Sequence, residues 1–393
     1  MQKLRIQPLD LLRGIVMVIM ALDHTRDFFH TGAQSFSPED LARTTPVLFF
    51  TRWITHFCAP VFVFLAGAGA CLSSRRGRSL ASLSRFLWTR GLWLLFIEFL
   101  VLSLALNFTW PPRLIPLQVI WALGWSMIAL SVLLYVPWRP LLAGSLAVIA
   151  LHNTLDGIPP EAFGSFAWLW HILHVPFAAF PLPGGITAMA LYPLIPWVAV
   201  MSAGYCFGRV YDLEPDRRRR MLWILGASLT LAFVALRLAN VYGDPSPWSA
   251  QATPSFTLLS FLRATKYPPS LLYLLMTLGP SILTLAALDR TEVSDANPFL
   301  AFGRVPLFYY LLHFYLLHVL MAVFAWFQYG RMDFVFQIPK AVNPAAVGYP
   351  PGYGYSLGAT YLIWLGAVAL LYLPCRWFVE VKRRHRSAWL SYL

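Results

Sequence analysis

Histidine and aspartate side chains at the end of the first apolar segment are the residues best suited to do chemistry. They are Asp23, His24, Asp27 and His30. A histidine held by a carboxylate is a common general base, because the acid fixes the imidazole tautomer and stabilises the protonated ring. The pattern predicts His24 or His30 as the base, with Asp23 or Asp27 orienting it. A purely structural role for the cluster is the alternative.

Two later apolar segments carry further histidines, His56 in the second and His313 and His318 in the ninth. Each is a candidate to bind the substrate or to donate a hydrogen bond to a developing oxyanion. Pro60 frees a backbone carbonyl one turn earlier and lets its helix bend around a cavity. His313 and His318 lie about 140° apart on a helix, so one could face the site and the other a neighbouring helix.

Basic residues near the other end of these segments could bind an anionic donor. Arg13 is three residues after Asp10, which predicts an ion pair on one helical face. Arg13 could instead meet an anionic ligand. Arg75, Arg76 and Arg78 are candidates for binding phosphate groups, or they serve only to orient the chain in a membrane.

Lys266 is a further candidate for substrate binding, although a salt bridge with Asp244 at the outer rim is the interpretation we favour. No metal site is expected, because the histidines in the first, second and ninth apolar segments have no local partner histidine at a spacing of three or four residues, and no Cys-x-x-Cys motif occurs. The four cysteines all lie in apolar stretches, at positions 58, 71, 206 and 375.

The elements that must position these residues are long apolar segments. A helix needs about 20 mostly apolar residues to cross a bilayer, and helices satisfy their own backbone groups in lipid. We expect an all-α fold, a single domain over residues 1–393 that forms a helix bundle. About ten transmembrane helices are predicted, at 8–28, 46–72, 86–107, 114–136, 138–152, 186–208, 219–241, 267–288, 298–327 and 356–378.

The composition supports this assignment. Of 393 residues, 58% are hydrophobic and only 12% are charged, whereas soluble domains carry about 25% charged residues. Disordered, coiled-coil and small disulfide-rich chains are excluded. The net charge of +13 comes from short arginine clusters between apolar segments. This pattern favours membrane orientation over nucleic-acid binding and predicts that both termini are cytoplasmic.

Several motifs resemble the catalytic region of the heparan-α-glucosaminide N-acetyltransferase family and its uncharacterised bacterial branch. They extend over almost the whole chain, at residues 9–14, 23–30, 59–67, 118–125, 192–197 and 303–313. The resemblance implies an integral membrane enzyme of the bacterial inner membrane that transfers an acetyl group from cytoplasmic acetyl-CoA. The acceptor would be an amine or hydroxyl of a sugar or glycan on the outer side of the bilayer.

The family's catalytic group is a histidine at the outer end of the first helix, and by its aromatic context His30 is the nearest match. His24 falls where the animal enzyme has an asparagine that lines the site. Recognition of the acceptor would then depend on the outer loops, at 153–185, 242–266 and 329–355. The resemblance leaves a homodimer open.

A transporter with an intramembrane histidine relay is the alternative function. Carriers often show paired, interrupted helices in two halves, and the sequence shows no such repeat. We therefore favour an acyltransferase in which several histidines converge on one pocket that a thioester donor reaches from the basic side.

Overall fold

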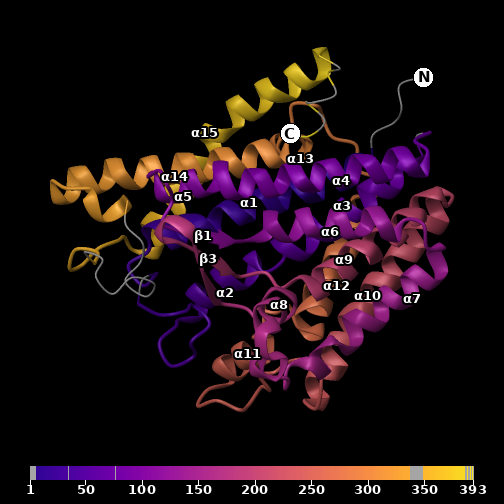
Figure 1. The fold of residues 1–393 in the computed structure, drawn as a ribbon, viewed down its shortest axis with the longest axis horizontal. Coiled ribbons are helices and arrows are strands. Elements are labelled where there is room, and N and C mark those ends of the chain that lie inside the picture. Colours follow the sequence, from indigo (N-terminus) through magenta and orange to yellow (C-terminus); the bar gives the residue numbers. More distant parts are fainter. Residues whose placement is uncertain are drawn as a thin grey trace.

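Helices make up most of the structure, which is a computed structural model and describes residues 6–33, 35–75, 77–336, 348–385, 387, 390 and 392. Most of them form a bundle of long neighbouring helices (Figure 1). The α-helices are α1 Gln7–Phe29, α2 Pro46–Thr55, α3 Cys58–Arg75, α4 Leu80–Phe96, α5 Ser103–Asn107, α6 Val119–Leu133, α7 Trp138–Leu151, α8 Ala167–Leu173, α9 Leu194–Phe207, α10 Pro215–Ala239, α11 Pro254–Leu262, α12 Leu271–Leu288, α13 Pro298–Arg304, α14 Pro306–Tyr329 and α15 Leu357–Arg384.

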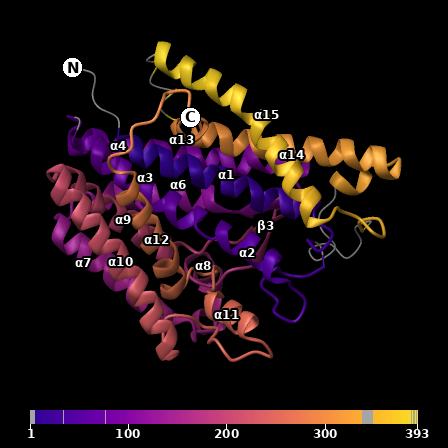
Figure 2. The ribbon, with the colours of Figure 1, turned by 180° about the vertical axis from the view of Figure 1, so that it is seen from behind.

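The long helices form two groups. α1 lies among α3, α13, α14 and α15, while α7, α10 and α12 pass along another side of the molecule (Figures 1 and 2). The first turns of α1 and the last turns of α15 meet at the same end of the bundle, because Arg13 and Lys382 line one cavity. This arrangement brings the first helix of the chain into the centre, where both ends of it face cavities.

Six helical segments of the described chain are long and apolar enough to cross a membrane, or seven if a bent pair at Trp138–Leu155 and Pro160–Leu173 forms one span. The expected total of about ten stays a prediction. α1 has the length of a span, with 23 residues, but it carries several charged side chains. α6 and α9, with 15 and 14 residues, are short for a span.

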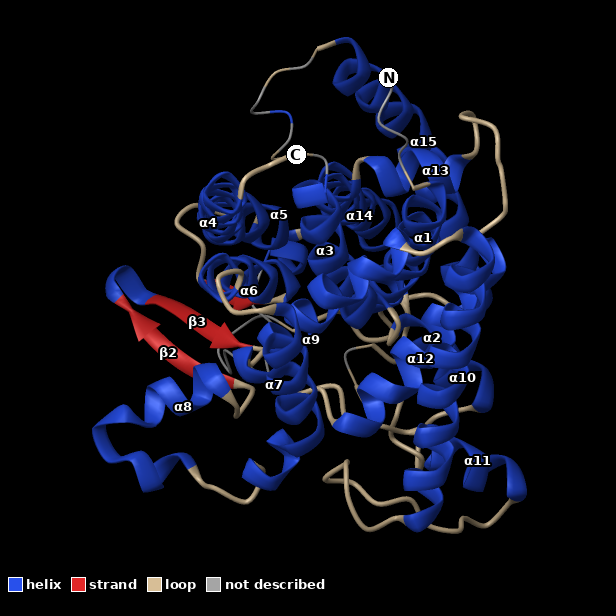
Figure 3. Cartoon of the chain, turned by 90° about the vertical axis from the view of Figure 1, so that its right-hand side faces the viewer, coloured by secondary structure: helices blue, strands red, loops and turns tan. Residues whose placement is uncertain are grey.

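The expectation of an all-α fold is wrong in one detail, since three short strands form a sheet in the order β1-β3-β2. β1 (Leu114–Leu117) pairs in parallel with β3 (Ile186–Ala190), and β2 (Ala178–Leu182) pairs antiparallel with β3. The β2–β3 hairpin lies beside α8 (Figure 3). Apolar runs this short do not distinguish a strand from the start of a helix, and Pro116 cannot continue a helical hydrogen-bond ladder.

Two of the expected spans are broken into two helices each. The first break separates α2 from α3, where Pro60 has no N–H to donate to the carbonyl of His56. That carbonyl instead accepts a hydrogen bond of 2.7 Å from the hydroxyl of Tyr273 in α12. The second break separates α13 from α14 at Val305, and Pro306 opens the new helix. Both breaks lie beside the cavities described below.

α4 continues into a π-helical turn at Ile97–Leu102, which contains the buried Glu98. Such turns often occur at functional sites. Glu98 Oε1 accepts a hydrogen bond of 2.7 Å from the backbone N–H of Gln118, the residue that precedes α6. Glu98 thereby fixes the start of α6, where Gln118 and Val119 reach a cavity.

α1 and α13 approach each other through two glycines. A Cβ at Gly14 would lie 1.7 Å from the carbonyl oxygen of Phe299, and one at Gly303 would lie 1.8 Å from that of Asp10. Small residues allow membrane helices to pack this closely. The predicted pair of Arg13 with Asp10 is present at 3.0 Å, and Arg13 also donates a hydrogen bond to the carbonyl of Gly303. The contact fixes the helix that carries the candidate active-site residues.

Candidate active site

A cavity of about 360 Å³, which we call the histidine chamber, is lined by residues of α1, α2, α3 and α14 and of the loops before α6 and α12. Three of the four expected catalytic residues line it, namely Asp23, His24 and Asp27. The charged and imidazole side chains that line it are Asp23, His24, Arg26, Asp27, Arg52 and Lys266. The chamber can therefore bind polar groups in a part of the chain that is otherwise apolar.

His24 is the histidine that lines this chamber in the described structure. Its ring centroid lies 5.1 Å from that of His313 and 4.3 Å from that of Phe314, both in α14. His313 is fully buried, and its Nδ1 lies 3.3 Å from the carbonyl of Tyr309. Two of the expected histidines thus meet, with His24 facing the cavity and His313 behind it.

The carboxylate of Asp23 is held between two guanidinium groups. One oxygen lies 3.0 Å from Arg26 in the same helix, and the other lies 2.5 Å from Arg52 in α2. Arg26 also contacts Asp27 at 2.5 Å. Since both oxygens of Asp23 face arginines, its charge neutralises the cations beside His24. The expected role of Asp23 as the orienter of an imidazole is not what this geometry favours.

His56 is buried and lies outside the lining of the histidine chamber. Its Nε2 lies 3.5 Å from Oε1 of Glu39, a residue of the loop between α1 and α2. Glu39 is also 3.7 Å from Arg52. Burial raises the pKa of Glu39, but His56 and Arg52 together outweigh this effect and hold it at about 2. His56 therefore anchors this loop over the chamber, which argues against its expected role as an oxyanion donor.

We expect Glu39→Gln to lower the stability of the protein at neutral pH. The pKa of Glu39 is about 2 in the folded protein, against an ordinary value of 4.5. Its stabilising effect is complete above about pH 4.5 and is lost as the pH falls towards 2. The shift corresponds to at most about 3 kcal/mol. Thermal unfolding in detergent should show a lower Tm for the variant at pH 7 and a smaller difference at pH 3.

The exposed Glu161 supplies the control for that measurement. We expect Glu161→Gln to unfold at the wild-type temperature at both pH values. If the Tm of Glu39→Gln differs from that of wild type by the same amount at pH 7 and pH 3, the interaction of Glu39 with His56 and Arg52 is not as described.

His30 and His318 do not line the histidine chamber. His30 follows the last turn of α1, and its Nδ1 accepts a hydrogen bond from the backbone N–H of Gly32. Burial, with a contribution from Arg26, lowers the pKa of His30. The two ring nitrogens of His318 lie 3.0 Å and 3.1 Å from backbone carbonyl oxygens of Ala105 and Val335. In this structure, His30 therefore contacts the backbone of the loop after α1, and His318 contacts two backbone carbonyls, while their expected roles at the site stay predictions.

Lys266 lines the histidine chamber and is 8% exposed. The expected salt bridge with Asp244 is wrong. Asp244 instead accepts hydrogen bonds from the backbone and hydroxyl of Thr265 and from the hydroxyl of Ser270, so it caps the loop before α12. Among the residues that the structure describes, Lys266 has no carboxylate in ion-pair distance, and its ammonium lies 5.1 Å from the ring centroid of Tyr267. It is placed to contact a polar group of a bound molecule.

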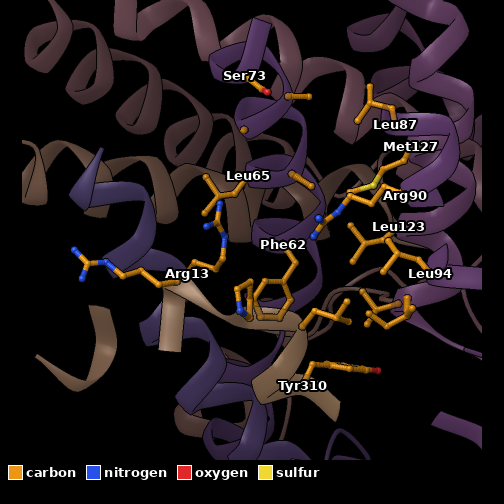
Figure 4. Close-up of a pocket in the computed structure, with 18 of the residues that line it drawn as sticks. Arg13, Phe62, Leu65, Ser73, Leu87, Arg90, Leu94, Leu123, Met127 and Tyr310 are labelled. Carbon is orange, nitrogen blue, oxygen red and sulfur yellow. The ribbon is translucent and has the colours of Figure 1, made fainter. Parts of the chain in front are cut away.

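A second cavity, of about 290 Å³, lies closer to the ends of α1 and α15 that meet. We call it the basic chamber. Among the described residues, four cationic side chains line it, namely Arg13, Arg90, Arg304 and Lys382, from α1, α4, α13 and α15. Aliphatic and aromatic residues make up much of the remaining lining (Figure 4). This lining can hold a ligand that carries both anionic and uncharged groups.

The residues expected to bind phosphate lie in different places in the structure. Arg13 lines the basic chamber, whereas Arg75 forms a half-exposed ion pair of 2.7 Å with Asp212. Arg78 lines a neighbouring hollow, which shares Phe86 and Lys382 with the basic chamber. Arg76 lies outside the described residues. Of the two described residues of the expected cluster, Arg75 and Arg78, it is Arg78 that lies close to the basic chamber.

The two chambers share part of their walls. Phe62 of α3, Val119 of α6 and Tyr310 of α14 line both of them. We call these three residues the waist. The bundle is therefore hollowed from both directions towards one position, which lies between the arginines of the basic chamber and His24 of the histidine chamber.

Several residues of these chambers are not among those expected from the sequence. Arg90 falls inside an expected apolar span, and its charge there was a usable signal. Glu39 lies in a polar loop, and nothing in the sequence links it to His56. Tyr310 is one of two consecutive tyrosines, and no pattern distinguishes it from Tyr309. The structure separates these two, because Tyr310 lines both chambers and Tyr309 lines neither of them.

No group of three or more His, Cys, Asp or Glu side chains in the described part of the chain is arranged to hold a metal ion. The four cysteines are buried and free.

Fold and chambers together define a polytopic helical membrane protein with a charged internal site that two cavities approach. A comparison with known protein families matches residues 5–238 to the family described as heparan-alpha-glucosaminide N-acetyltransferase, catalytic. The match covers more than half of the chain, so this protein belongs to that family and is a membrane protein of the acetyltransferase type. No curated protein matches the sequence. The matched residues include α1, α2 and α3, whereas α14 with Tyr310 and His313 follows them.

Proposed function

We propose that the protein transfers an acetyl group from acetyl-CoA to an amine or hydroxyl of a sugar-type acceptor. The donor enters the basic chamber from the cytoplasm, and the acceptor enters the histidine chamber from the other side. The observation that carries this proposal is the waist, where the two chambers share Phe62, Val119 and Tyr310. Two substrates that stay on opposite sides of a bilayer can meet there. Family membership favours this transferase over a carrier.

The basic chamber suits the donor. CoA carries phosphate groups at one end and an uncharged pantetheine arm that ends in the thioester. Arg13, Arg90, Arg304 and Lys382 supply cations at the chamber walls, and arginine binds phosphate through paired, charge-assisted hydrogen bonds. The apolar lining towards Phe62 accommodates the arm. In this arrangement the thioester points at the histidine chamber.

The histidine chamber suits the acceptor and the proton that it must lose. His24 lines the cavity and acts as the general base, since a neutral imidazole has a ring nitrogen that can accept the acceptor's proton. Asp23 keeps Arg26 and Arg52 neutralised beside it. Lys266 contacts a polar group of the acceptor from the rim of α12. His313 limits the orientation of the His24 ring by packing against it.

Binding of CoA tests the donor half of this proposal. We expect purified wild-type protein in detergent to bind CoA and Arg90→Met to bind it at least ten-fold more weakly, because a hydrogen bond to a charged group contributes about 1.5–3 kcal/mol. Isothermal titration calorimetry measures both affinities. Arg139→Met is the control, because Arg139 lines neither chamber, and it should bind CoA as wild type does.

Turnover tests the whole proposal. Wild-type protein with radiolabelled acetyl-CoA should release free CoA faster when amino sugars or their hydroxyl analogues are added. Absence of CoA binding, together with absence of acceptor-dependent CoA release over a panel of both acceptor types, would overturn the proposed function.

A further inference from the structure

Tyr310 occupies a unique place among the tyrosines of the described chain, because it lines both chambers. It belongs to the first turns of α14, just after the break at Val305 and Pro306. Its side chain is 3% exposed and lies near Phe62 in the lining of the basic chamber (Figure 4). The side chain of Tyr310 would therefore face the thioester end of an acyl donor that enters through the basic chamber.

The hydroxyl of Tyr310 is buried and has no hydrogen-bond partner among the described residues. A buried hydroxyl normally finds a partner, because leaving it unpaired is costly. Tyr273 and Tyr315 follow the rule, since Tyr273 donates to the carbonyl of His56 and Tyr315 to that of Val101, whereas Tyr211 and Tyr309 share the unpaired state of Tyr310. Tyr310 differs from Tyr211 and Tyr309 because it lines both chambers, where a bound molecule can accept the hydrogen bond of its hydroxyl.

Tyr310 is also close to the proposed base. Its ring centroid lies 5.3 Å from that of Phe314 and 5.5 Å from that of His313. The same two rings contact His24, at 4.3 Å and 5.1 Å. Tyr310 and His24 are therefore neighbours across one aromatic cluster, on the two sides of the position where a thioester and an acceptor meet.

Acyl transfer needs a hydrogen-bond donor near the carbonyl oxygen of the transferred group. When a nucleophile attacks a thioester, negative charge develops on the carbonyl oxygen, and a preorganised hydrogen bond to that oxygen is often the largest contribution of the site. The histidines expected to supply it do not line the histidine chamber. His56 contacts Glu39, and His313 lies behind His24.

We propose that the hydroxyl of Tyr310 donates the hydrogen bond that stabilises the oxyanion of the transferring acetyl group. This inference rests on the proposed function. The lone pair of the acceptor attacks the carbonyl carbon while His24 removes the acceptor's proton, and the C=O electron pair moves to the oxygen that Tyr310 binds. As that pair returns, the C–S bond breaks and CoA leaves as a thiolate, which takes the proton from His24. Tyr310 keeps its own proton throughout.

Tyr310→Phe tests the inference, because it removes the hydroxyl and keeps the ring. We expect kcat to fall about 100-fold, as for the loss of one oxyanion donor in other enzymes. The KM for acetyl-CoA and the affinity for CoA should stay within about two-fold of wild type, since the lost hydrogen bond forms chiefly in the transition state. Acceptor-dependent CoA release and calorimetry measure these quantities.

Tyr309→Phe is the matched control. Tyr309 is the preceding residue, is fully buried, and also has a hydroxyl without a partner among the described residues, but it lines neither chamber. We expect Tyr309→Phe to keep wild-type kcat. Equal loss in both variants, or a Tyr310→Phe variant with wild-type kcat, would overturn the inference while the proposed function stands.

Two further results separate the possible failures. A fluorotyrosine at position 310 nearly keeps the volume of the side chain and makes its hydroxyl a stronger hydrogen-bond donor. It therefore tests the role of the Tyr310 hydroxyl even if Tyr310→Phe folds poorly. An unchanged kcat with fluorotyrosine would contradict the role of Tyr310. A wild-type protein that binds CoA but transfers no acetyl group to any acceptor would overturn the proposed function and the role of Tyr310 with it.

Discussion

Replacing His24 with glutamine is expected to reduce acetyl transfer by about 10²- to 10⁴-fold, which is the usual contribution of a general base. The side chain of glutamine fills similar space and retains hydrogen bonding, but it cannot accept the proton of the acceptor at neutral pH. Binding of CoA should be unaffected, because the basic chamber lies on the other side of the waist. Acceptor-dependent CoA release and calorimetry on the same preparation measure the two effects.

His30→Gln tests which of the two candidate histidines, His24 or His30, is the general base. His24 lines the histidine chamber, whereas His30 binds the backbone of Gly32 outside that lining. We expect His30→Gln to keep most of the activity. The assignment of His24 is wrong if His30→Gln abolishes transfer and His24→Gln retains it.

Gly303→Ala is expected to have the largest effect on folding. Its Cβ would lie 1.8 Å from the carbonyl oxygen of Asp10 and 3.0 Å from the backbone nitrogen of Gly14. Backbone atoms of a packed helix cannot move away cheaply, so the cost should reach or exceed the upper end of the usual range for overpacking, about 1–3 kcal/mol. We expect a sharply reduced yield of monodisperse protein and a lower Tm in detergent.

Gly366→Ala in α15 serves as the control for Gly303→Ala. A Cβ at Gly366 meets no atom within 4 Å, and alanine favours a helix over glycine by about 1 kcal/mol. Its Tm should equal or slightly exceed that of wild type. If Gly303→Ala behaves like Gly366→Ala, α1 and α13 do not pack as described.

Local patterns in the sequence predicted the contacts that depend on helical spacing alone. Asp10 and Arg13, three residues apart, form the expected ion pair. The effect of Pro60 on its helix was also predictable, because a proline always removes the hydrogen bond to the carbonyl four residues earlier. These predictions succeed because backbone geometry within one helix fixes them.

Contacts between helices were not predictable in the same way. The sequence predicts that several histidines converge, but the rotation of each helix decides where an imidazole points. His24 and His313 meet, whereas His56 contacts the loop residue Glu39 and His318 binds backbone carbonyls. The salt bridge expected for Lys266 fails for a related reason, since Asp244 caps a loop. Partners supplied by distant loops leave no periodic signal in a single sequence.

The site that the sequence suggested is thus only partly the site that the structure supports. Arg13, Asp23, His24 and Lys266 line the two chambers, and Arg90 and Tyr310 join them. Arg75 does not, because Asp212 holds it at the surface. A charged residue within an apolar segment was the more reliable indicator than a basic cluster between segments.

The waist has a consequence for the membrane itself. A continuous chain of water molecules conducts protons readily. If water filled both chambers and the waist between them, protons would leak across the membrane. Phe62 and Val119 place apolar side chains where the two cavities meet, and such constrictions exclude water. Under the proposed function the acyl arm would reach past these apolar side chains, and between turnovers the same side chains would keep protons from crossing the bilayer.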